Sequence, residues 1–104
     1  MNAIENQVRE LVEVELAAAN ERFPQFHSAH EGWAVIREEA DELSSEIAYL
    51  EGYLISMWNY IKNNRADLVE EKVGRAQNYA INAACEAIQV AAMCRKFMEM
   101  EAEK

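Results

Sequence analysis

The chain has 104 residues, of which 51% are hydrophobic and 28% are charged, so it is expected to fold as one domain (residues 1–104) around a buried core. Its 19 acidic side chains outnumber 10 lysines and arginines, and the net charge of −9 disfavours binding to nucleic acid, because a basic surface is needed to neutralise phosphates. Three glycines and one proline leave too few turn residues for a β-sandwich or barrel, whereas 17 alanines and 17 glutamates favour helices. The composition therefore predicts an all-α protein.

The sequence carries no sign of a membrane or secreted protein. No apolar run reaches the 18 residues of a membrane span, and the first residues lack a signal-peptide pattern, so we expect a cytoplasmic protein without a membrane partner. Cys85 and Cys94 are separated by roughly 13 Å of rise in one predicted helix, which is too far for a disulfide. Both are expected to be small core residues.

The first predicted helix covers residues 2–20. Asn2 and Glu5 have the spacing of a capping box, in which two side chains satisfy backbone N–H groups at a helix start. Apolar residues with helical spacing follow at Ile4, Val8, Leu11, Val12 and Leu16. The only proline, Pro24, then marks a short connector.

The second predicted helix is long and covers residues 28–63. Ser28 and Glu31 form a second capping box at its start. Eight apolar residues then recur at alternating spacings of four and three, which is the pattern of one helical seam: Ile36, Ala40, Leu43, Ile47, Leu50, Leu54, Met57 and Ile61. Polar residues 63–67 interrupt the pattern, and Asp67 is predicted to cap the helix that follows.

The third predicted helix covers residues 67–98 and folds back on the second as an antiparallel helical hairpin. Its expected core positions are Val73, Ala80, Ala84, Ala87, Ala91, Cys94 and Met98. Between residues 83 and 94 this helix is apolar on nearly every side, so we expect a second copy of the chain to cover part of it. The expected architecture is an antiparallel helical bundle completed by oligomerisation, as a homo-oligomer of two or four chains, with residues 99–104 frayed.

Two glycines occupy matching positions in this hairpin. With the turn near residue 64, residues at one level have numbers whose sum is close to 128, and Gly52 and Gly74 meet that condition. They either allow a close crossing of the two helices or are tolerated without a role.

Four acidic side chains fall within residues 38–42. At 100° per residue, Glu39 and Glu42 lie on one flank beside the apolar seam, whereas Glu38 points almost the opposite way. Like charges one turn apart destabilise a helix by a few tenths of a kcal/mol per pair. Taken alone, the segment fits either a cation site or a solvated acidic face.

A second acidic element favours the cation site. Glu86 is the only charged residue between residues 83 and 94, and burying an isolated carboxylate costs several kcal/mol unless a cation or donors satisfy it. The hairpin places Glu86 level with Glu42, and Gln89 level with Glu39. Along their own helices, Glu39 and Glu42 are three residues apart, as are Glu86 and Gln89, which is about 4.5 Å of rise. Three carboxylates and an amide oxygen suit Mg²⁺ or Mn²⁺.

The segments that carry these acids are Glu38-Glu39-Ala40-Asp41-Glu42-Leu43 and Glu86-Ala87-Ile88-Gln89. They resemble the two motifs of the MazG-like, all-α nucleoside triphosphate pyrophosphohydrolases, which are E-E-x-x-E and, on the next helix, E-x-x-D. The resemblance covers roughly residues 28–98.

This resemblance implies a Mg²⁺-dependent or Mn²⁺-dependent hydrolase that cleaves a nucleotide substrate, an NTP or dNTP, to its monophosphate and pyrophosphate. It implies Glu39, Glu42, Glu86 and Gln89 as metal ligands, the three glutamates being catalytic, in a bundle of two or more chains. Gln89 stands where the family has Asp, which removes one charge from the site. Glu38 lies off the ligand face, where it either supports the site from behind or is a plain surface acid.

A different class of protein fits the helical seams equally well: a non-catalytic helical oligomer that serves as an interaction or regulatory module, with a degenerate metal site. It does not explain Glu86 within an apolar stretch. No spacing singles out a substrate-binding residue. The basic residues near the motifs are expected to form ordinary surface pairs: Arg37, Lys72, Arg75, Arg95 and Lys96. Core or interface positions are expected for Trp33, Trp58 and Tyr60, and capping or surface positions for His27 and His30.

Overall fold

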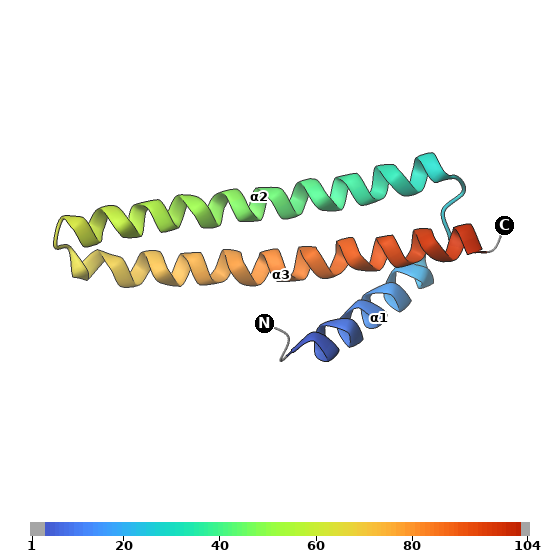
Figure 1. The fold of residues 1–104 in the computed structure, drawn as a ribbon, viewed down its shortest axis with the longest axis horizontal. Coiled ribbons are helices and arrows are strands. Elements are labelled where there is room, and N and C mark those ends of the chain that lie inside the picture. The colour runs from blue at the N-terminus through green and yellow to red at the C-terminus, as the bar shows by residue number, and fades with distance from the viewer. Residues whose placement is uncertain (1–3, 103–104) are drawn as a thin grey trace. The chain divides into compact units, whose positions relative to one another are not determined.

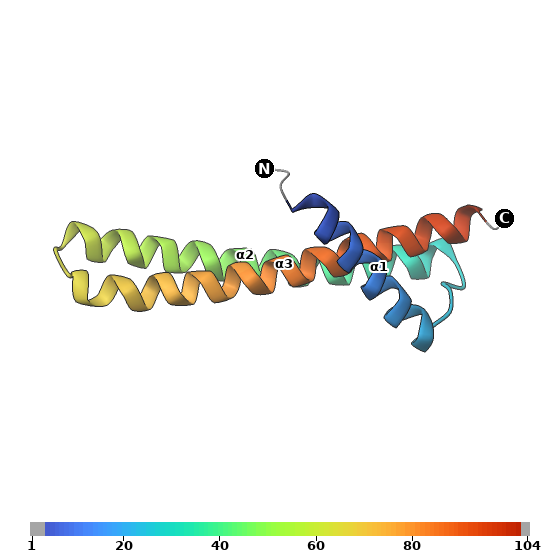
Figure 2. The same cartoon turned by 90° about the horizontal axis from the view of Figure 1, so that it is seen from below.

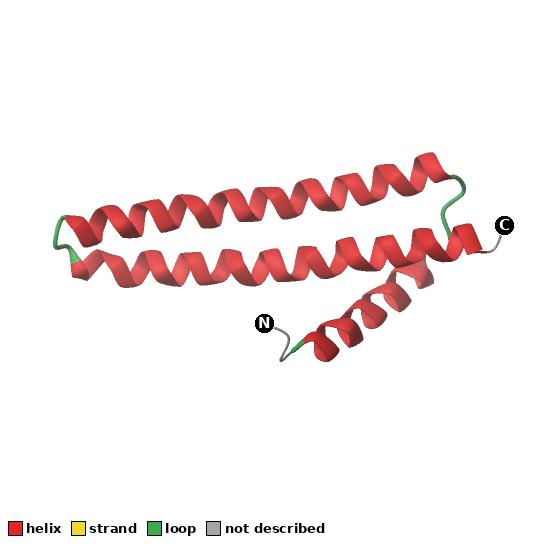
Figure 3. Ribbon diagram, viewed as in Figure 1, coloured by secondary structure: helices red, strands yellow, loops and turns green. Residues whose placement is uncertain are grey.

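The structure is a computed structural model that describes residues 4–102, and three α-helices hold nearly all of them (Figure 1). They are α1 (Glu5–Arg22), α2 (Ala29–Lys62) and α3 (Ala66–Ala102). No strand occurs in residues 4–102, and only short loops separate the helices (Figure 3). The predicted all-α class is therefore confirmed.

The chain forms two compact units. We call the one made of Met1–Ala40 and Glu86–Lys104 the α1 unit, and the one made of Asp41–Cys85 the hairpin unit. Within the hairpin unit, α2 and α3 lie side by side and run in opposite directions, which is the helical hairpin that the sequence predicts (Figure 2).

The start of α2 is fixed by the predicted cap. The Glu31 backbone N–H donates to Ser28 Oγ at 3.1 Å, which satisfies one of the unpaired donors of the first turn. At the start of α1 the described N-cap residue is Ile4, which makes no side-chain cap hydrogen bond. Asn2, the predicted cap of α1, lies outside the described residues.

The turn between α2 and α3 falls where the polar residues predict it. Asn64 has a φ of 56°, a left-handed conformation that asparagine tolerates better than most residues, and the Arg65 N–H donates to the Tyr60 carbonyl at 2.9 Å. The predicted capping role of Asp67 is wrong, because α3 already begins at Ala66. Asp67 instead lies within the first turn and pairs with Arg65 at 3.1 Å, which lowers the pKa of its carboxyl.

Both outer helix ends run further than the sequence predicts. Helix α1 continues past residue 20 to Arg22, and α3 continues past residue 98 to Ala102. The predicted fraying of residues 99–104 is therefore wrong for residues 99–102, since Met100 packs into the core with 7% of its surface exposed. Residues 103–104 lie outside the described part of the chain.

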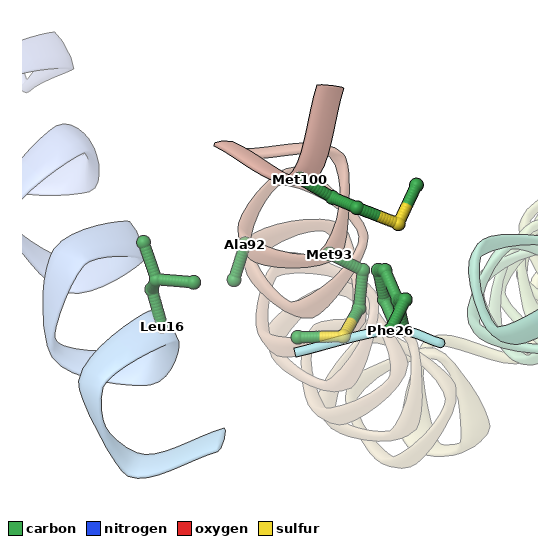
Figure 4. Packing of buried hydrophobic residues seen from close by; sticks show 5 residues of the cluster. All are labelled: Leu16, Phe26, Ala92, Met93 and Met100. Atoms are coloured by element: carbon green, nitrogen blue, oxygen red, sulfur yellow. The ribbon is translucent and has the colours of Figure 1, made fainter. Parts of the chain in front are cut away.

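The core of the α1 unit is small and draws on three segments. Leu16 comes from α1, Phe26 from the connector after Pro24, and the other three buried members from α3 (Figure 4). The full cluster is Leu16, Phe26, Ala92, Met93 and Met100. Apolar residues packed against it are Val12, Ala19, Val35, Ile36 and Phe97. The connector is thereby tied to α3.

The buried stripe of α3 differs from the predicted one. Val73 and Met98 were expected in the core, yet they are 44% and 58% exposed. Buried and half-buried residues instead recur at Lys72, Ala76, Tyr79, Ala83, Glu86, Val90, Met93, Phe97 and Met100. This stripe contains polar side chains, so an apolar pattern alone selects the neighbouring positions. The predicted core position of Cys85 is wrong as well, because it is exposed, whereas Cys94 is half-buried.

The glycines separate into two kinds. A Cβ added at Gly52 or Gly74 meets nothing within 4 Å, so these glycines do not serve a close crossing. Gly32 is different, because an added Cβ would lie 2.5 Å from Phe97 Cδ2 and 3.0 Å from Phe26 Cδ2. The aromatic rings of the α1 unit therefore pack directly on the backbone of α2.

A membrane span requires a long helix made mostly of apolar residues, and across residues 4–102 the three helices do not meet this requirement.

Candidate metal centre

Three of the predicted ligands lie together. One carboxylate oxygen from each of Glu39, Glu42 and Glu86 lies within 4.8 Å of the other two. Glu39 and Glu86 belong to the α1 unit, and Glu42 follows Glu39 by one turn of the continuous helix α2. Since residues three apart share a helix face, the geometry of α2 alone keeps the Glu42 carboxylate beside that of Glu39.

This donor set fits a hard divalent cation. Carboxylate oxygens are the ligands that Mg²⁺ and Mn²⁺ prefer. Two oxygens of one octahedral Mg²⁺ lie at most about 4.2 Å apart, because each is about 2.1 Å from the ion. Only one pair among three ligands can lie opposite each other, and the other pairs are about 3.0 Å apart. The spacing in the structure is up to 4.8 Å, so the oxygens need to close by at most about 1.8 Å. Rotation of exposed or half-buried glutamate side chains readily provides that movement.

Gln89 completes the group from the α1 unit. Its terminal amide contacts both carboxylates of that unit, and the orientation that pairs donors with acceptors has the amide nitrogen donating to Glu39 Oε2 at 2.8 Å and Glu86 Oε2 at 3.2 Å. An amide offers donors on one side and an acceptor on the other. The same side chain can therefore bridge two carboxylates through its nitrogen, or, turned by 180°, present an oxygen to a cation.

The residues of this group differ in exposure. Glu39 and Glu86 are half-buried, whereas Glu42 is exposed. Partial burial makes two like charges costly to hold side by side without a cation or donors. Glu38 is exposed and lies outside the group, and its supporting role stays a prediction.

A pocket adjoins the carboxylates within the α1 unit. It has a volume of about 740 Å³, within the range of small-molecule sites. Glu39 and Gln89 line one part of it, and Met93, Lys96 and Phe26 line another. The sequence pattern predicts neither this pocket nor its aromatic residues. The one available signal was a pair of phenylalanines on either side of Pro24.

Lys96 is not the surface residue that the sequence predicts. Only 3% of its surface is exposed, its ammonium donates to the Phe23 carbonyl, and the Nζ atom lies 5.0 Å from the centre of the Phe26 ring. Burial lowers the pKa of Lys96, and the nearby Glu31 carboxylate opposes that effect. The burial of Lys96 follows from the packing of the connector, which no pattern on α3 encodes.

Other basic residues do form surface pairs as predicted. Arg75 pairs with Glu71 at 2.9 Å, and Arg95 pairs with Glu13 and with Glu99. The carboxylate partner in each case raises the pKa of the arginine. Arginines held this way are engaged with acids of the chain itself.

The remaining candidates fall outside the group. Trp33 and Trp58 are 65% and 57% exposed, so neither is a core residue of the chain. His27 pairs with Glu31 at 3.0 Å and is exposed, in agreement with the predicted surface position.

Comparison with family models, with curated proteins and with solved structures finds nothing that matches this chain.

Proposed function

We propose that the chain is a divalent-cation-dependent nucleotide pyrophosphohydrolase, which cleaves an NTP or dNTP to the monophosphate and pyrophosphate. The observation that supports it is the meeting of Glu39, Glu42 and Glu86, with ligand oxygens within 4.8 Å, beside a pocket of about 740 Å³. Glu39 belongs to the carboxylate group and also lines the pocket, so a molecule in the pocket would have one end against the carboxylates. The resemblance of the two acidic segments to the MazG-like enzymes points the same way.

The reaction would use the chain's charges as follows. A triphosphate approaches a protein of net charge −9, so its anionic end needs a cation held on the carboxylates. Bound Mg²⁺ or Mn²⁺ would neutralise phosphate oxygens and lower the pKa of water. Glu39, Glu42 and Glu86 would hold the ion, and a carboxylate oxygen turned away from it would accept the proton of the attacking water.

The proposed hydrolysis is a single displacement at the α-phosphorus. The oxygen of one water forms a bond to the α-phosphorus, and the bond from that phosphorus to the oxygen bridging the α- and β-phosphates breaks. Pyrophosphate leaves with that oxygen, and the monophosphate keeps the oxygen of the water. The Gln89 amide would orient the Glu39 and Glu86 carboxylates throughout.

The proposal is tested by pyrophosphate release. Canonical and modified nucleoside triphosphates are incubated with the chain and Mg²⁺, and release is compared with that of Glu86→Gln and of Glu51→Gln, an exposed acid of α2 used as the control. We expect release by the wild type and by Glu51→Gln, and a loss of at least about 100-fold in Glu86→Gln, because a cation ligand is removed. Equal rates in all three, or release from no nucleotide, would contradict it.

A second candidate is favoured by the surface of the hairpin unit. Eight of its large hydrophobic side chains are 40% to 63% exposed: Ile47, Tyr49, Leu54, Ile55, Trp58, Ile61, Val73 and Ile81. Such side chains are typical of a surface that another chain covers. They support a non-catalytic helical oligomer that serves as an interaction module. An oligomer that binds no divalent cation and releases no pyrophosphate would favour this candidate.

A further inference from the structure

The pocket of the α1 unit has two chemically different parts. Glu39 and Gln89 line the polar part, at the candidate metal centre. Apolar and aromatic side chains line the rest, among them Phe23, Phe26 and Met93. A flat, partly apolar group fits the second part better than a phosphate does.

Acidic residues dominate the charged lining of this pocket. Its lining includes Glu15, Glu21, Glu31, Glu39, Arg22 and Lys96, so carboxylates outnumber basic groups four to two. A phosphate away from a bound cation would meet net repulsion there. The anionic end of a ligand therefore belongs at Glu39 and Gln89, and its uncharged end at the aromatic part.

Lys96 supplies the hydrogen-bond donor of the aromatic part. The ammonium has three N–H groups and no acceptor. One N–H donates to the Phe23 carbonyl, and the cation lies over the Phe26 ring at 5.0 Å. Two N–H groups therefore remain for a ligand in the pocket that Lys96 lines. Phe23 is 71% exposed and also lines the pocket, so its ring is accessible for stacking.

The two parts of the pocket are separated along α3. Gln89 and Lys96 are seven residues apart, about 10.5 Å of rise, and both line the pocket. A molecule with phosphates at the first residue would present its base near the second.

We propose, on the basis of the function proposed above, that Lys96 determines base specificity by donating to a carbonyl oxygen of a base stacked on Phe23. An ammonium cannot accept a hydrogen bond from an exocyclic amine. The chain should therefore prefer a base with a carbonyl where its counterpart has an amine, guanine over adenine or thymine over cytosine.

The test uses deoxynucleoside monophosphates, which lack the anhydride bond and cannot turn over. Dissociation constants are measured by titration calorimetry with Mg²⁺ for dGMP, dAMP, dTMP and dCMP. We expect at least about a tenfold preference for the carbonyl member of one pair. Lys96→Met should bring the two constants of that pair within about twofold. Lys96→Gln should do the same, because its amide both donates and accepts.

The control is Lys72→Met, which removes a lysine that lies 5.7 Å from the Tyr53 ring centre in the hairpin unit. It should keep the wild-type preference. If Lys96 only ties the connector to α3, its variants will melt at lower temperature and weaken all four ligands equally, which overturns the proposal. Absence of binding, or of preference, by the wild type overturns it too. Preference without pyrophosphate release would refute the proposed reaction and retain the role of Lys96.

Discussion

At the scale of single residues, the candidate centre depends on how three carboxylates are held close together. Gln89 affects how strongly these carboxylates repel one another, because its amide lies 2.8 Å from a Glu39 oxygen and 3.2 Å from a Glu86 oxygen. As a donor it lowers the repulsion between the two carboxylates when no cation is bound. As an acceptor it is a weaker cation ligand than a carboxylate would be, since it carries no charge.

Replacing Gln89 by Asp should therefore have two opposite effects. Without a divalent cation, Gln89→Asp loses the donor and adds a charge, so its melting temperature should be lower than that of the wild type. With Mn²⁺, the added carboxylate should tighten binding by about tenfold, and the Mn²⁺-induced rise in melting temperature should be larger. Thermal unfolding with EDTA and with Mn²⁺ measures both effects. A smaller Mn²⁺ shift than in the wild type would contradict a ligand position for residue 89.

At the scale of helices, most of what could be predicted came from patterns within one segment. The alternating spacing of apolar residues and the cap at Ser28 define α2, and residues 63–65 mark its end. The antiparallel register then follows from the turn position, which is why Glu86 was expected level with Glu42, and Gln89 level with Glu39. Packing between segments was not predictable in this way, because the buried stripe of α3 includes Lys72 and Glu86, which an apolar pattern omits.

The α1 unit shows the same limit of prediction. The connector folds Phe26 onto α3 and buries Lys96, a contact between residues 70 positions apart that no local spacing encodes. The close packing of Phe97 on Gly32 is likewise a tertiary contact. The candidate carboxylates could be predicted because they lie on two regular helices, whereas the pocket beside them depends on an irregular segment.

Glycine-to-alanine substitutions test this packing. Gly32→Ala should destabilise the fold by about 1–3 kcal/mol, because the new Cβ would lie 2.5 Å from the Phe97 ring and force it to move. Gly52→Ala is the matched control on the same helix. It should stabilise the fold by about 0.5–1 kcal/mol, since nothing lies within 4 Å and alanine is the better helix former. Urea unfolding of both variants measures the difference, and a stabilising Gly32→Ala would contradict the contact.

At the scale of the whole molecule, the balance of buried and exposed apolar surface is unusual for a chain that acts alone. Among residues 4–102, six hydrophobic side chains are buried, whereas fifteen large hydrophobic side chains are exposed. A domain of this size buries only a small hydrophobic core and is stabilised by little apolar burial. We therefore retain the proposal of a homo-oligomer.

The oligomer proposal is tested by the mass in solution. Light scattering after size exclusion should give a multiple of the 11.9 kDa chain mass. Replacement of Ile55 and Trp58, which are 63% and 57% exposed, by Gln should shift the mass towards one chain. A control with Glu51→Gln should leave the mass unchanged. A monomer of wild type at concentrations of tens of micromolar would contradict the proposal.

If Glu39, Glu42 and Glu86 share one divalent cation, the chain should bind Mn²⁺ through all three carboxylates. Titration calorimetry is carried out on the wild type, Glu86→Gln and the control Glu51→Gln. We expect the wild type and Glu51→Gln to bind one Mn²⁺ per chain with equal affinity, and Glu86→Gln to bind it at least about tenfold more weakly, because one charged ligand is lost. Equal Mn²⁺ affinity in all three proteins, or no binding by the wild type, would contradict it.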